Sequence, residues 1–221
     1  MKPYVLQVDL DGEKCLVVGG GPIGLVKTKM LVDSGAHIRV VSRSFVPGFE
    51  KLVEIEMVER AFDATDLEGM KLVHAATADE KLNESIAAQC AEKDILCCVA
   101  SDASLGTFSV PAYLDKGDIR VTISTNGASP SFGARLRRTI DTVLPENPQP
   151  YLESLRAIRD ESKEAISDPN LRMRLNAFLA SEQGEEKFVE QGEDGWMRWA
   201  KELLANPESV DESYTPKWNR D

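Results

Sequence analysis

The chain has 221 residues, of which 42% are hydrophobic and 29% are charged, so it can build a core in one large or two small domains. Its formal net charge of −11 argues against a general nucleic-acid-binding surface, and no run approaches the roughly 18 uninterrupted apolar residues of a membrane span. Acidic residues near the N-terminus, and the lack of an apolar stretch there, argue against a secretory signal, so a cytoplasmic location is expected.

The cysteines and histidines give no sign of a metal site. Four cysteines occur without a C-x-x-C spacing, and of the two histidines His74 falls inside a predicted strand. Reduced, buried thiols and a packed core histidine are therefore expected, and no metal-binding residue can be assigned.

The N-terminal part of the chain predicts a strand–helix–strand unit. Weak alternation at 4–8 predicts an edge strand, the apolar run at 15–20 predicts a buried parallel strand, and 37–41 predicts the next strand. Between the last two, a helix is expected over 23–34, ended by Gly35. The residues expected on its buried face are Ile23, Val26, Met30 and Leu31.

The alternation of strands and helices continues to about residue 113. Strands are expected at 55–60, 71–77 and 95–100, and an amphipathic helix is expected at 79–92. This order predicts an α/β fold with a Rossmann-like, doubly wound parallel sheet.

The character of the chain changes after this region. Two strands around a turn at Lys116 and Gly117 are expected within 107–127, and four candidate helices follow from Ser131 onward. We therefore expect an α/β domain, a small α+β region and a helical domain with an acidic tail. Their predicted bounds are 1–113, 114–148 and 149–221.

A glycine-rich motif, G-x-G-x-x-G, lies between the first buried strand and the helix. Gly19 would allow the tight turn, Gly21 would let a pyrophosphate approach the backbone, and Gly24 would let the helix pack close to the strand. Pro22 and Ile23 open the helix, whose free N–H groups attract phosphate. A dinucleotide site is therefore predicted, with a purely structural glycine turn as the alternative.

The end of the second strand lacks the carboxylate that binds a ribose 2′-OH in many NAD-binding proteins. Ser42, Arg43 and Ser44 stand there instead. Arg43 is able to contact a 2′-phosphate, which favours NADP, whereas the serines are able to hydrogen-bond either ribose. These residues leave the choice between NAD and NADP open.

Thr77 ends the strand expected at 71–77, at the edge where open α/β sheets bind ligands. It is therefore a candidate neighbour of the cofactor. Asp79 stands two residues later and is expected to cap the next helix.

Five segments, in order and spacing, resemble the precorrin-2 dehydrogenase family, the N-terminal module of siroheme synthases. These segments are GGGPIGLVKTKMLVDSGAHIRVVS, AATADEKLN, TFSVPA, VTISTNGASP and ARLRR. The resemblance is close over about residues 3–145, and residues 150–185 look like the small helical domain of the family's stand-alone members. The last 35 or so residues carry no matching motif.

The resemblance implies a function and partners. It implies NAD-dependent oxidation of precorrin-2 to sirohydrochlorin in siroheme biosynthesis, and some members also insert ferrous iron. It implies a homodimer in which residues after about 113 exchange contacts, so that 114–148 is the dimerisation and tetrapyrrole-site region. Because members usually use NAD without the acidic residue, the resemblance favours NAD here.

The resemblance also implies catalytic residues, with one departure from the family. Many members carry an aspartate after the strand at 95–100, and a gapless alignment puts Ser101 at that position and Asp102 one residue later. Asp102 is one candidate acceptor of the proton that leaves with the hydride, with turn capping as the alternative for this residue. In the other interpretation, Ser101 occupies the place of the aspartate, and the base lies elsewhere or is water. Because the carboxylate is displaced, iron insertion is in more doubt than the dehydrogenation. The candidate catalytic residues are therefore Asp102, Ser101 and Ser124.

The substrate side is expected in the region that matches the family's S-S-G-G stretch. The eight carboxylates of precorrin-2 call for cations, which the arginine-rich segment would supply. The candidate substrate-binding residues are Thr125, Asn126, Gly127, Ser129, Arg135 and Arg137, with Arg138, Arg120 and Lys116 nearby in the sequence. A solvated helix face is the alternative for each arginine.

Two non-enzymatic functions remain as alternatives. They are a dinucleotide-binding regulatory module and a tetrapyrrole-binding scaffold that has lost catalysis. No nucleic-acid or membrane partner is expected. Regulatory modules of this kind often add a DNA-binding helix pair and a basic surface, and neither is evident in the sequence.

Overall fold

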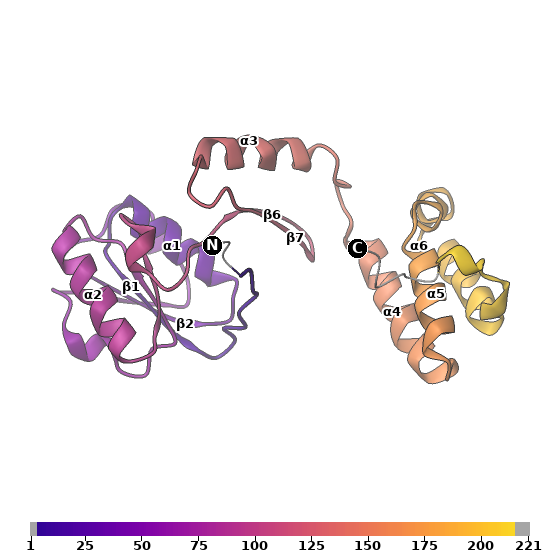
Figure 1. Ribbon diagram of the computed structural model, residues 1–221, viewed down its shortest axis with the longest axis horizontal. Helices are drawn as coiled ribbons and strands as arrows, with labels where there is room; N and C mark the ends of the chain where they lie inside the picture. Colours follow the sequence, from indigo (N-terminus) through magenta and orange to yellow (C-terminus); the bar gives the residue numbers. More distant parts are fainter. Residues whose placement is uncertain (1–3, 215–221) are drawn as a thin grey trace. The chain divides into compact units, whose positions relative to one another are not determined.

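The computed structural model describes residues 4–214 (Figure 1). The chain divides between Pro111 and Ala112 into two compact units. The first unit is an α/β sheet domain, and the second combines a β-hairpin with helices.

The first unit contains a five-stranded parallel sheet with the strand order β3-β2-β1-β4-β5. The strands are β1 (Lys14–Val18), β2 (His37–Ser42), β3 (Ile55–Glu59), β4 (Leu72–Ala75) and β5 (Leu96–Val99). Helices α1 (Pro22–Val32) and α2 (Glu80–Glu92) cover opposite faces of the sheet (Figure 1). The predicted Rossmann-like doubly wound sheet is confirmed.

The central strand explains why the sheet is covered on both faces. Cys15, Leu16, Val17 and Val18 of β1 are all buried, and alternate side chains enter two different apolar clusters. The cluster that contains Leu16 and Val18 includes Ile86 of α2. The cluster that contains Cys15 and Val17 includes Leu31 of α1. Full burial of about four such side chains on one strand contributes roughly 6–12 kcal/mol before chain entropy is counted.

Two sequence-based expectations in this unit are wrong. Residues 4–8 form no strand, because none of the strands found in residues 4–214 pairs with their backbone. Ile23 and Val26 of α1 are about half exposed, whereas Leu31 is buried as expected, together with Gly24 and Thr28. The helix packs against the sheet through small side chains one position away from the expected face, because Gly24 permits a close approach.

The second unit begins with an antiparallel hairpin. Strands β6 (Ala112–Lys116) and β7 (Ile119–Ile123) pair around a turn at Gly117, whose φ is +55°. Helix α3 (Pro130–Asp141) packs against this hairpin. The predicted hairpin is confirmed, with Pro111 immediately before its first strand.

Three further helices form a separate core in the second unit. They are α4 (Gln149–Ala165), α5 (Pro169–Leu179) and α6 (Glu182–Ala205). Fully buried Trp196 of α6 lies at their centre, and its indole N–H donates to the carbonyl of Gly184 at 2.9 Å. Gly192, with φ of +67°, kinks α6 within its acidic stretch.

Short 3₁₀ helices complete the described chain. They lie at Phe49–Lys51, Ala64–Leu67, Ala103–Leu105, Pro207–Ser209 and Glu212–Tyr214. Every helix within residues 4–214 is too short or too polar to cross a lipid bilayer.

Candidate active site

The strand order of the first unit defines a crevice at the carboxyl ends of β1 and β4. The sheet runs outward from β1 through β2 on one side and from β1 through β4 on the other. Parallel sheets bind ligands at such a reversal point, outside the carboxyl ends of the strands. The loops after β1, β2, β4 and β5 therefore form the candidate site.

Two glycines of the glycine-rich motif are required by the fold itself. Gly19 has a φ of +123°, and a Cβ there would overlap the carbonyl oxygen of Ala76 after β4. A Cβ at Gly24 would overlap the carbonyl oxygen of Gly19. These residues bring the loop after β1 against the loop after β4 and α1 against β1.

Gly21 differs from these two glycines. Its φ is −80° with an extended ψ, and a Cβ built on it meets no atom of the chain within 4 Å. Neither backbone strain nor packing within the chain requires a glycine there, so the free space is available to a ligand. A pyrophosphate that approaches the backbone fits this space.

The start of α1 favours an anion at the same place. Pro22 is the first helical residue, no side chain caps the helix at Gly21, and the first turn holds no acidic residue. Its backbone N–H groups therefore remain free for phosphate oxygens, with the positive end of the helix dipole behind them.

Gly20 is a site residue that the sequence analysis missed. A Cβ at Gly20 would overlap the carbonyl oxygen of Ser44 and lie 2.9 Å from the Ser42 hydroxyl oxygen. The Val46 N–H also donates to the Gly20 carbonyl at 2.8 Å. The loop after β2 is thus folded onto the glycine-rich loop, a contact that no local pattern encodes.

The three residues considered for the choice between NAD and NADP lie at the end of β2 and in the loop after it. They are Ser42, Arg43 and Ser44. The Ser42 hydroxyl donates to the Ser44 carbonyl at 2.7 Å, so it is used in shaping the loop. The Arg43 and Ser44 side chains are exposed at the edge of the crevice.

The loops after β4 and β5 are joined by a buried asparagine, Asn83 of α2. Its side chain bonds to the backbone and hydroxyl of Thr77 and reaches the Ser101 hydroxyl oxygen at 3.4 Å. Asn83 was not predicted. The signal available in the sequence was a polar residue in the apolar stripe that also contains Ile86, Ala87 and Cys90.

Asp102 is engaged in a local cap. Its carboxylate accepts from the Ser104 N–H at 2.8 Å and from the Ser104 hydroxyl at 2.7 Å, and so begins the 3₁₀ helix Ala103–Leu105. These two hydrogen bonds lower the pKa of Asp102 below its ordinary value. The carboxylate is exposed and remains charged, which makes it an anion at this edge.

Two other predictions in this unit are confirmed. Asp79 caps α2 by accepting from the Leu82 N–H at 3.1 Å. His74 is 2% exposed in β4 and packs edge-on against Phe108, with a ring-centroid distance of 5.7 Å. Burial, together with the nearby charge of Lys27, lowers the pKa of His74 to about 4.

The cysteines match the expectation of reduced, buried thiols. All four are buried and unpaired by disulfides. Burial raises the pKa of Cys15 to about 11. Within residues 4–214, no group of three or more His, Cys, Asp or Glu side chains is arranged to hold a metal ion.

The loop that precedes α3 contains the candidates of the second unit. The Ser124 hydroxyl oxygen accepts from the Asn126 N–H at 3.2 Å. Asn126 and Gly127 have φ values of +51° and +80°, so the tight turn uses the left-handed tolerance expected of Asn. The Thr125 hydroxyl accepts from the Ser129 N–H, and the Ser129 hydroxyl caps α3 through the Phe132 N–H.

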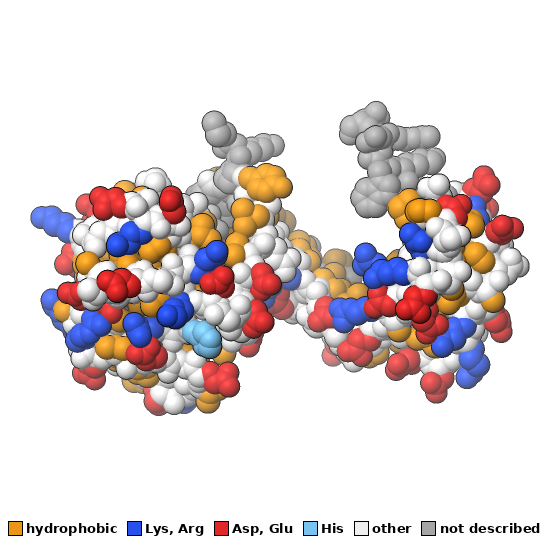
Figure 2. Space-filling view, turned by 90° about the horizontal axis from the view of Figure 1, so that it is seen from below, with side chains coloured by type: hydrophobic (Ala, Val, Ile, Leu, Met, Phe, Trp, Pro, Cys, Tyr) orange, Lys and Arg blue, Asp and Glu red, His pale blue; other side chains and the backbone are white. Residues whose placement is uncertain are grey.

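The basic residues of the second unit fall into two groups. Lys116 and Arg120 are paired with Asp141 and Asp115, at 3.1 Å and 2.7 Å respectively. The second group, on α3, is exposed and consists of Arg135, Arg137 and Arg138. The Arg135 guanidinium lies 4.7 Å from the Phe132 ring centroid. Figure 2 shows acidic and basic side chains interspersed over both units on the face it displays.

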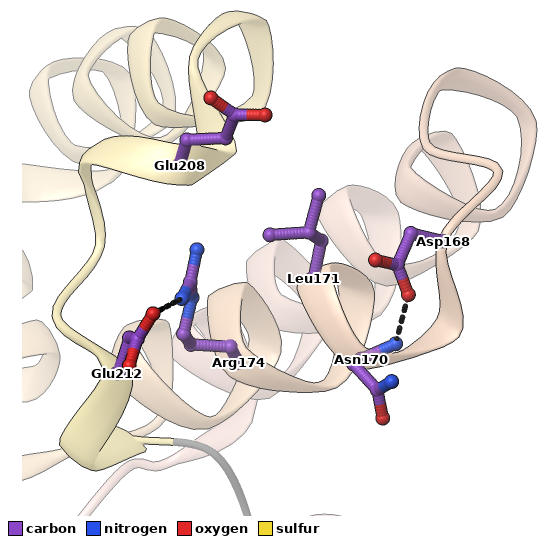
Figure 3. Close-up of a pocket in the computed structure, with 6 residues that line it drawn as sticks. All are labelled: Asp168, Asn170, Leu171, Arg174, Glu208 and Glu212. Atoms are coloured by element: carbon purple, nitrogen blue, oxygen red, sulfur yellow. Dashed lines mark hydrogen bonds and ion pairs between the residues drawn. The ribbon is translucent and has the colours of Figure 1, made fainter.

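The helical part of the second unit has a cavity of about 850 Å³ (Figure 3). Buried Arg174 of α5 lies 3.9 Å from the Glu212 carboxylate, and Asp168, Asn170, Leu171 and Glu208 complete the lining. None of the predicted site residues lines this cavity.

Two family models match the chain, one over the sheet domain and one over the hairpin and α3. Residues 6–112 match a family described as putative NAD(P)-binding, and residues 116–142 match one described as sirohaem biosynthesis protein central. A siroheme synthase from Gluconobacter oxydans is 35% identical over 164 residues, and one from Thioalkalivibrio sulfidiphilus is 34% identical over 188 residues. The chain belongs to the precorrin-2 dehydrogenase and siroheme synthase family. These matches cover 70% and 84% of the chain, which spans 35% and 38% of the length of these two relatives.

A solved structure also shares the family's fold. SirC, a precorrin-2 dehydrogenase, is 24% identical and superposes with a TM-score of 0.74, covering 92% of this chain and 99% of that one. The likeness confirms the combination of a Rossmann-like sheet, a small antiparallel sheet and C-terminal helices.

Proposed function

We propose that this protein is an NAD-dependent precorrin-2 dehydrogenase, which produces sirohydrochlorin for siroheme synthesis. The observation that carries the proposal is Gly21, where a Cβ would meet no atom of the chain within 4 Å, at the reversal point of a sheet in this family. In the overall reaction, precorrin-2 and NAD⁺ give sirohydrochlorin, NADH and one proton.

Different residues of the first unit would bind different parts of the dinucleotide. Bound NAD⁺ supplies the hydride acceptor. Gly21 and the first turn of α1 would hold the pyrophosphate, and the loop at Ser42, Arg43 and Ser44 would contact the adenosine half. Thr77 would line the crevice beside Gly19, whose backbone contacts the Ala76 carbonyl.

The proton that accompanies the hydride needs an acceptor at the same edge. We assign it to Asp102, because its exposed carboxylate is charged at neutral pH and follows β5 directly after Ser101. The hydride step depends chiefly on how the reacting carbon is positioned against the cofactor, so a weak base is sufficient.

The second unit would bind the substrate carboxylates. The exposed guanidinium groups of Arg135 and Arg137 suit bidentate pairing with carboxylates. The loop residues Ser124–Ser129 that precede α3 would border the tetrapyrrole, and Ser124 is the candidate catalytic residue of this loop.

Ferrous iron is a second substrate to be tested rather than a resident cofactor. Some members of the family insert it into sirohydrochlorin, and a carboxylate that accepts pyrrole protons would assist this step. In this chain Ser101 stands at the family's aspartate position and Asp102 is committed to a cap. We therefore propose dehydrogenation as the principal activity, with iron insertion slower than in members that carry the aspartate.

We propose that the protein acts as a homodimer. An isolated two-stranded hairpin is marginally stable in water, so β6–β7 depends on what packs against it, and within the chain α3 does so. Exposed apolar residues near α3, among them Phe132 at 47% and Val143 at 76% exposure, are suited to contact with a second copy.

The decisive experiment is incubation of the purified protein with precorrin-2 and NAD⁺. NADH and sirohydrochlorin should appear in equal amounts, and omission of either substrate is the control. Binding of NAD⁺ without any NADH would instead indicate a regulatory module or a non-catalytic scaffold. Addition of Fe²⁺ to sirohydrochlorin, with and without the protein, measures iron insertion separately.

A further inference from the structure

Asn83 connects two loops of the candidate active site through its side-chain amide. It is fully buried on the first turns of α2, whereas Ser101 is exposed at the end of β5. A buried amide is costly unless its donors and acceptors are paired. All the partners of the Asn83 side chain belong to the loops after β4 and β5.

The backbone of Thr77 fixes the orientation of this amide. Asn83 Oδ1 accepts from the Thr77 N–H at 3.2 Å, and Nδ2 donates to the Thr77 carbonyl at 3.1 Å. Because the N–H can only donate and the carbonyl can only accept, the amide cannot be turned around. Asn83 therefore binds Thr77 as a neighbouring β-strand would, two residues beyond Ala75, the last residue of β4 that pairs with β5.

This orientation determines the role of Ser101. The second N–H of Nδ2 points to the Ser101 Oγ at 3.4 Å, so this oxygen is the acceptor of the bond. The Ser101 hydroxyl hydrogen is then left to be donated. Within residues 4–214 no acceptor for it is found, and the side chain is exposed at the sheet edge.

We propose that Asn83 is a positioning residue that holds Thr77 in place for the cofactor and makes Ser101 a hydrogen-bond donor to the bound reactants. This inference rests on the proposed dehydrogenase function. It gives Ser101 a role different from that of a base, although it stands where family members carry a carboxylate.

The test compares NAD⁺ affinity, kcat and KM for Asn83→Asp, Ser101→Ala and the double variant. Asn83→Asp keeps the size and the acceptors for Thr77 but loses both donated bonds. We expect its Kd for NAD⁺ to rise about 10-fold and its kcat/KM for precorrin-2 to fall about 10- to 100-fold. Ser101→Ala should lower kcat/KM about 10-fold, and the double variant should lose little more than Asn83→Asp alone, since Asn83 acts through Ser101.

Ile86→Val is the matched control, because Ile86 is equally buried on the same helix but packs in the apolar cluster. It should lower the melting temperature while leaving the NAD⁺ affinity and kcat/KM unchanged. Wild-type affinity and turnover in Asn83→Asp, or full additivity of the two substitutions, would overturn the positioning role. If Asn83→Asp does not fold, undiminished turnover in Ser101→Ala, an exposed position, would overturn it as well.

The failure of the proposed function has a different signature. A wild-type protein that binds NAD⁺ but forms no NADH would remove the dehydrogenase proposal. The Kd comparison between wild type and Asn83→Asp would still decide whether Asn83 positions the cofactor loop.

Discussion

At the scale of single residues, the glycine-rich motif contains glycines that are needed for different reasons. Gly24 lacks a side chain because the Gly19 carbonyl occupies the space, whereas at Gly21 the space is open. A side chain added at Gly21 should therefore weaken ligand binding, whereas one added at Gly24 should lower the free energy of unfolding.

We expect Gly21→Val to weaken NAD⁺ binding at least 10-fold, because the side chain would occupy the space that suits the pyrophosphate. Its free energy of unfolding should change by about 1 kcal/mol or less, since a Cβ at this position meets no atom of the chain within 4 Å. Gly24→Ala should instead lower the free energy of unfolding by about 1–3 kcal/mol. Calorimetric titration and urea unfolding of both variants measure this contrast, and equal affinity in Gly21→Val and wild type would contradict it.

His74 should make stability depend on pH. Its pKa is about 4 in the folded protein and 6.5 for an exposed histidine, so the unfolded chain binds the extra proton between these values. Keeping His74 neutral therefore contributes about 3 kcal/mol to the free energy of unfolding. This contribution is complete above about pH 6.5 and is lost as the pH falls towards 4.

Urea unfolding at several pH values between 7 and 4 measures this dependence. In His74→Leu the loss over this window should be smaller by about the same amount, about 3 kcal/mol. His37 is the only other histidine and is exposed, so His37→Gln is a suitable control. An unchanged pH dependence in His74→Leu would show that the buried imidazole is not the cause.

Asp102 combines a cap and a proposed base, and one substitution separates the two. Asn caps helices about as well as Asp but cannot accept a proton. Asp102→Asn should therefore preserve stability and lower kcat roughly 100-fold, whereas Asp102→Glu should retain part of the activity. Undiminished NADH formation by Asp102→Asn would assign the carboxylate to capping alone.

The pH dependence of the reaction follows from the lowered pKa of Asp102. Since its hydrogen bonds to Ser104 keep the carboxylate charged below its ordinary range, kcat should not fall through protonation of this group between neutral pH and about pH 4.5. A decline of kcat centred near pH 6 would point to a different proton acceptor.

At the scale of elements, helix α3 exposes three arginines, Arg135, Arg137 and Arg138. Arg135 and Arg137 are free of the ion pairs that engage Lys116 and Arg120. Because a charged hydrogen bond to a carboxylate contributes about 1.5–3 kcal/mol, Arg135→Ala and Arg137→Ala should each raise the KM for precorrin-2 about 10- to 100-fold. Arg159→Ala, at an exposed position of α4, is the control and should leave KM unchanged. Unaltered KM in both α3 variants would show that the face is merely solvated.

At the scale of the whole molecule, the proposed homodimer can be measured directly. Light scattering should give twice the chain mass of 24.4 kDa at micromolar concentration. Val143→Asp, at a highly exposed apolar position, should shift this equilibrium towards the monomer, since a charge would be buried in the contact. A monomeric mass for the wild type at all concentrations would contradict the dimer.

The regular elements were predictable because their signals are local. The strands of the first unit, the hairpin around Gly117 and the cap at Asp79 follow from apolar runs, turn residues and capping preferences within a few positions. The same local signals failed at 4–8 and on α1. Alternation cannot supply a pairing partner, and the apolar character of Ile23 and Val26 does not reveal that Gly24 lies against the Gly19 carbonyl.

The sequence by itself determined the doubly wound sheet, the glycine-rich loop and the family resemblance, because these depend on periodicity and spacing along the chain. Only the tertiary structure decided which glycine leaves room for a ligand and that Asn83 joins Thr77 to Ser101. It also decided that Asp102 is held in a cap. Each of these facts depends on atoms from separate loops meeting at the carboxyl edge of the sheet, and such distances exist only once the chain is folded.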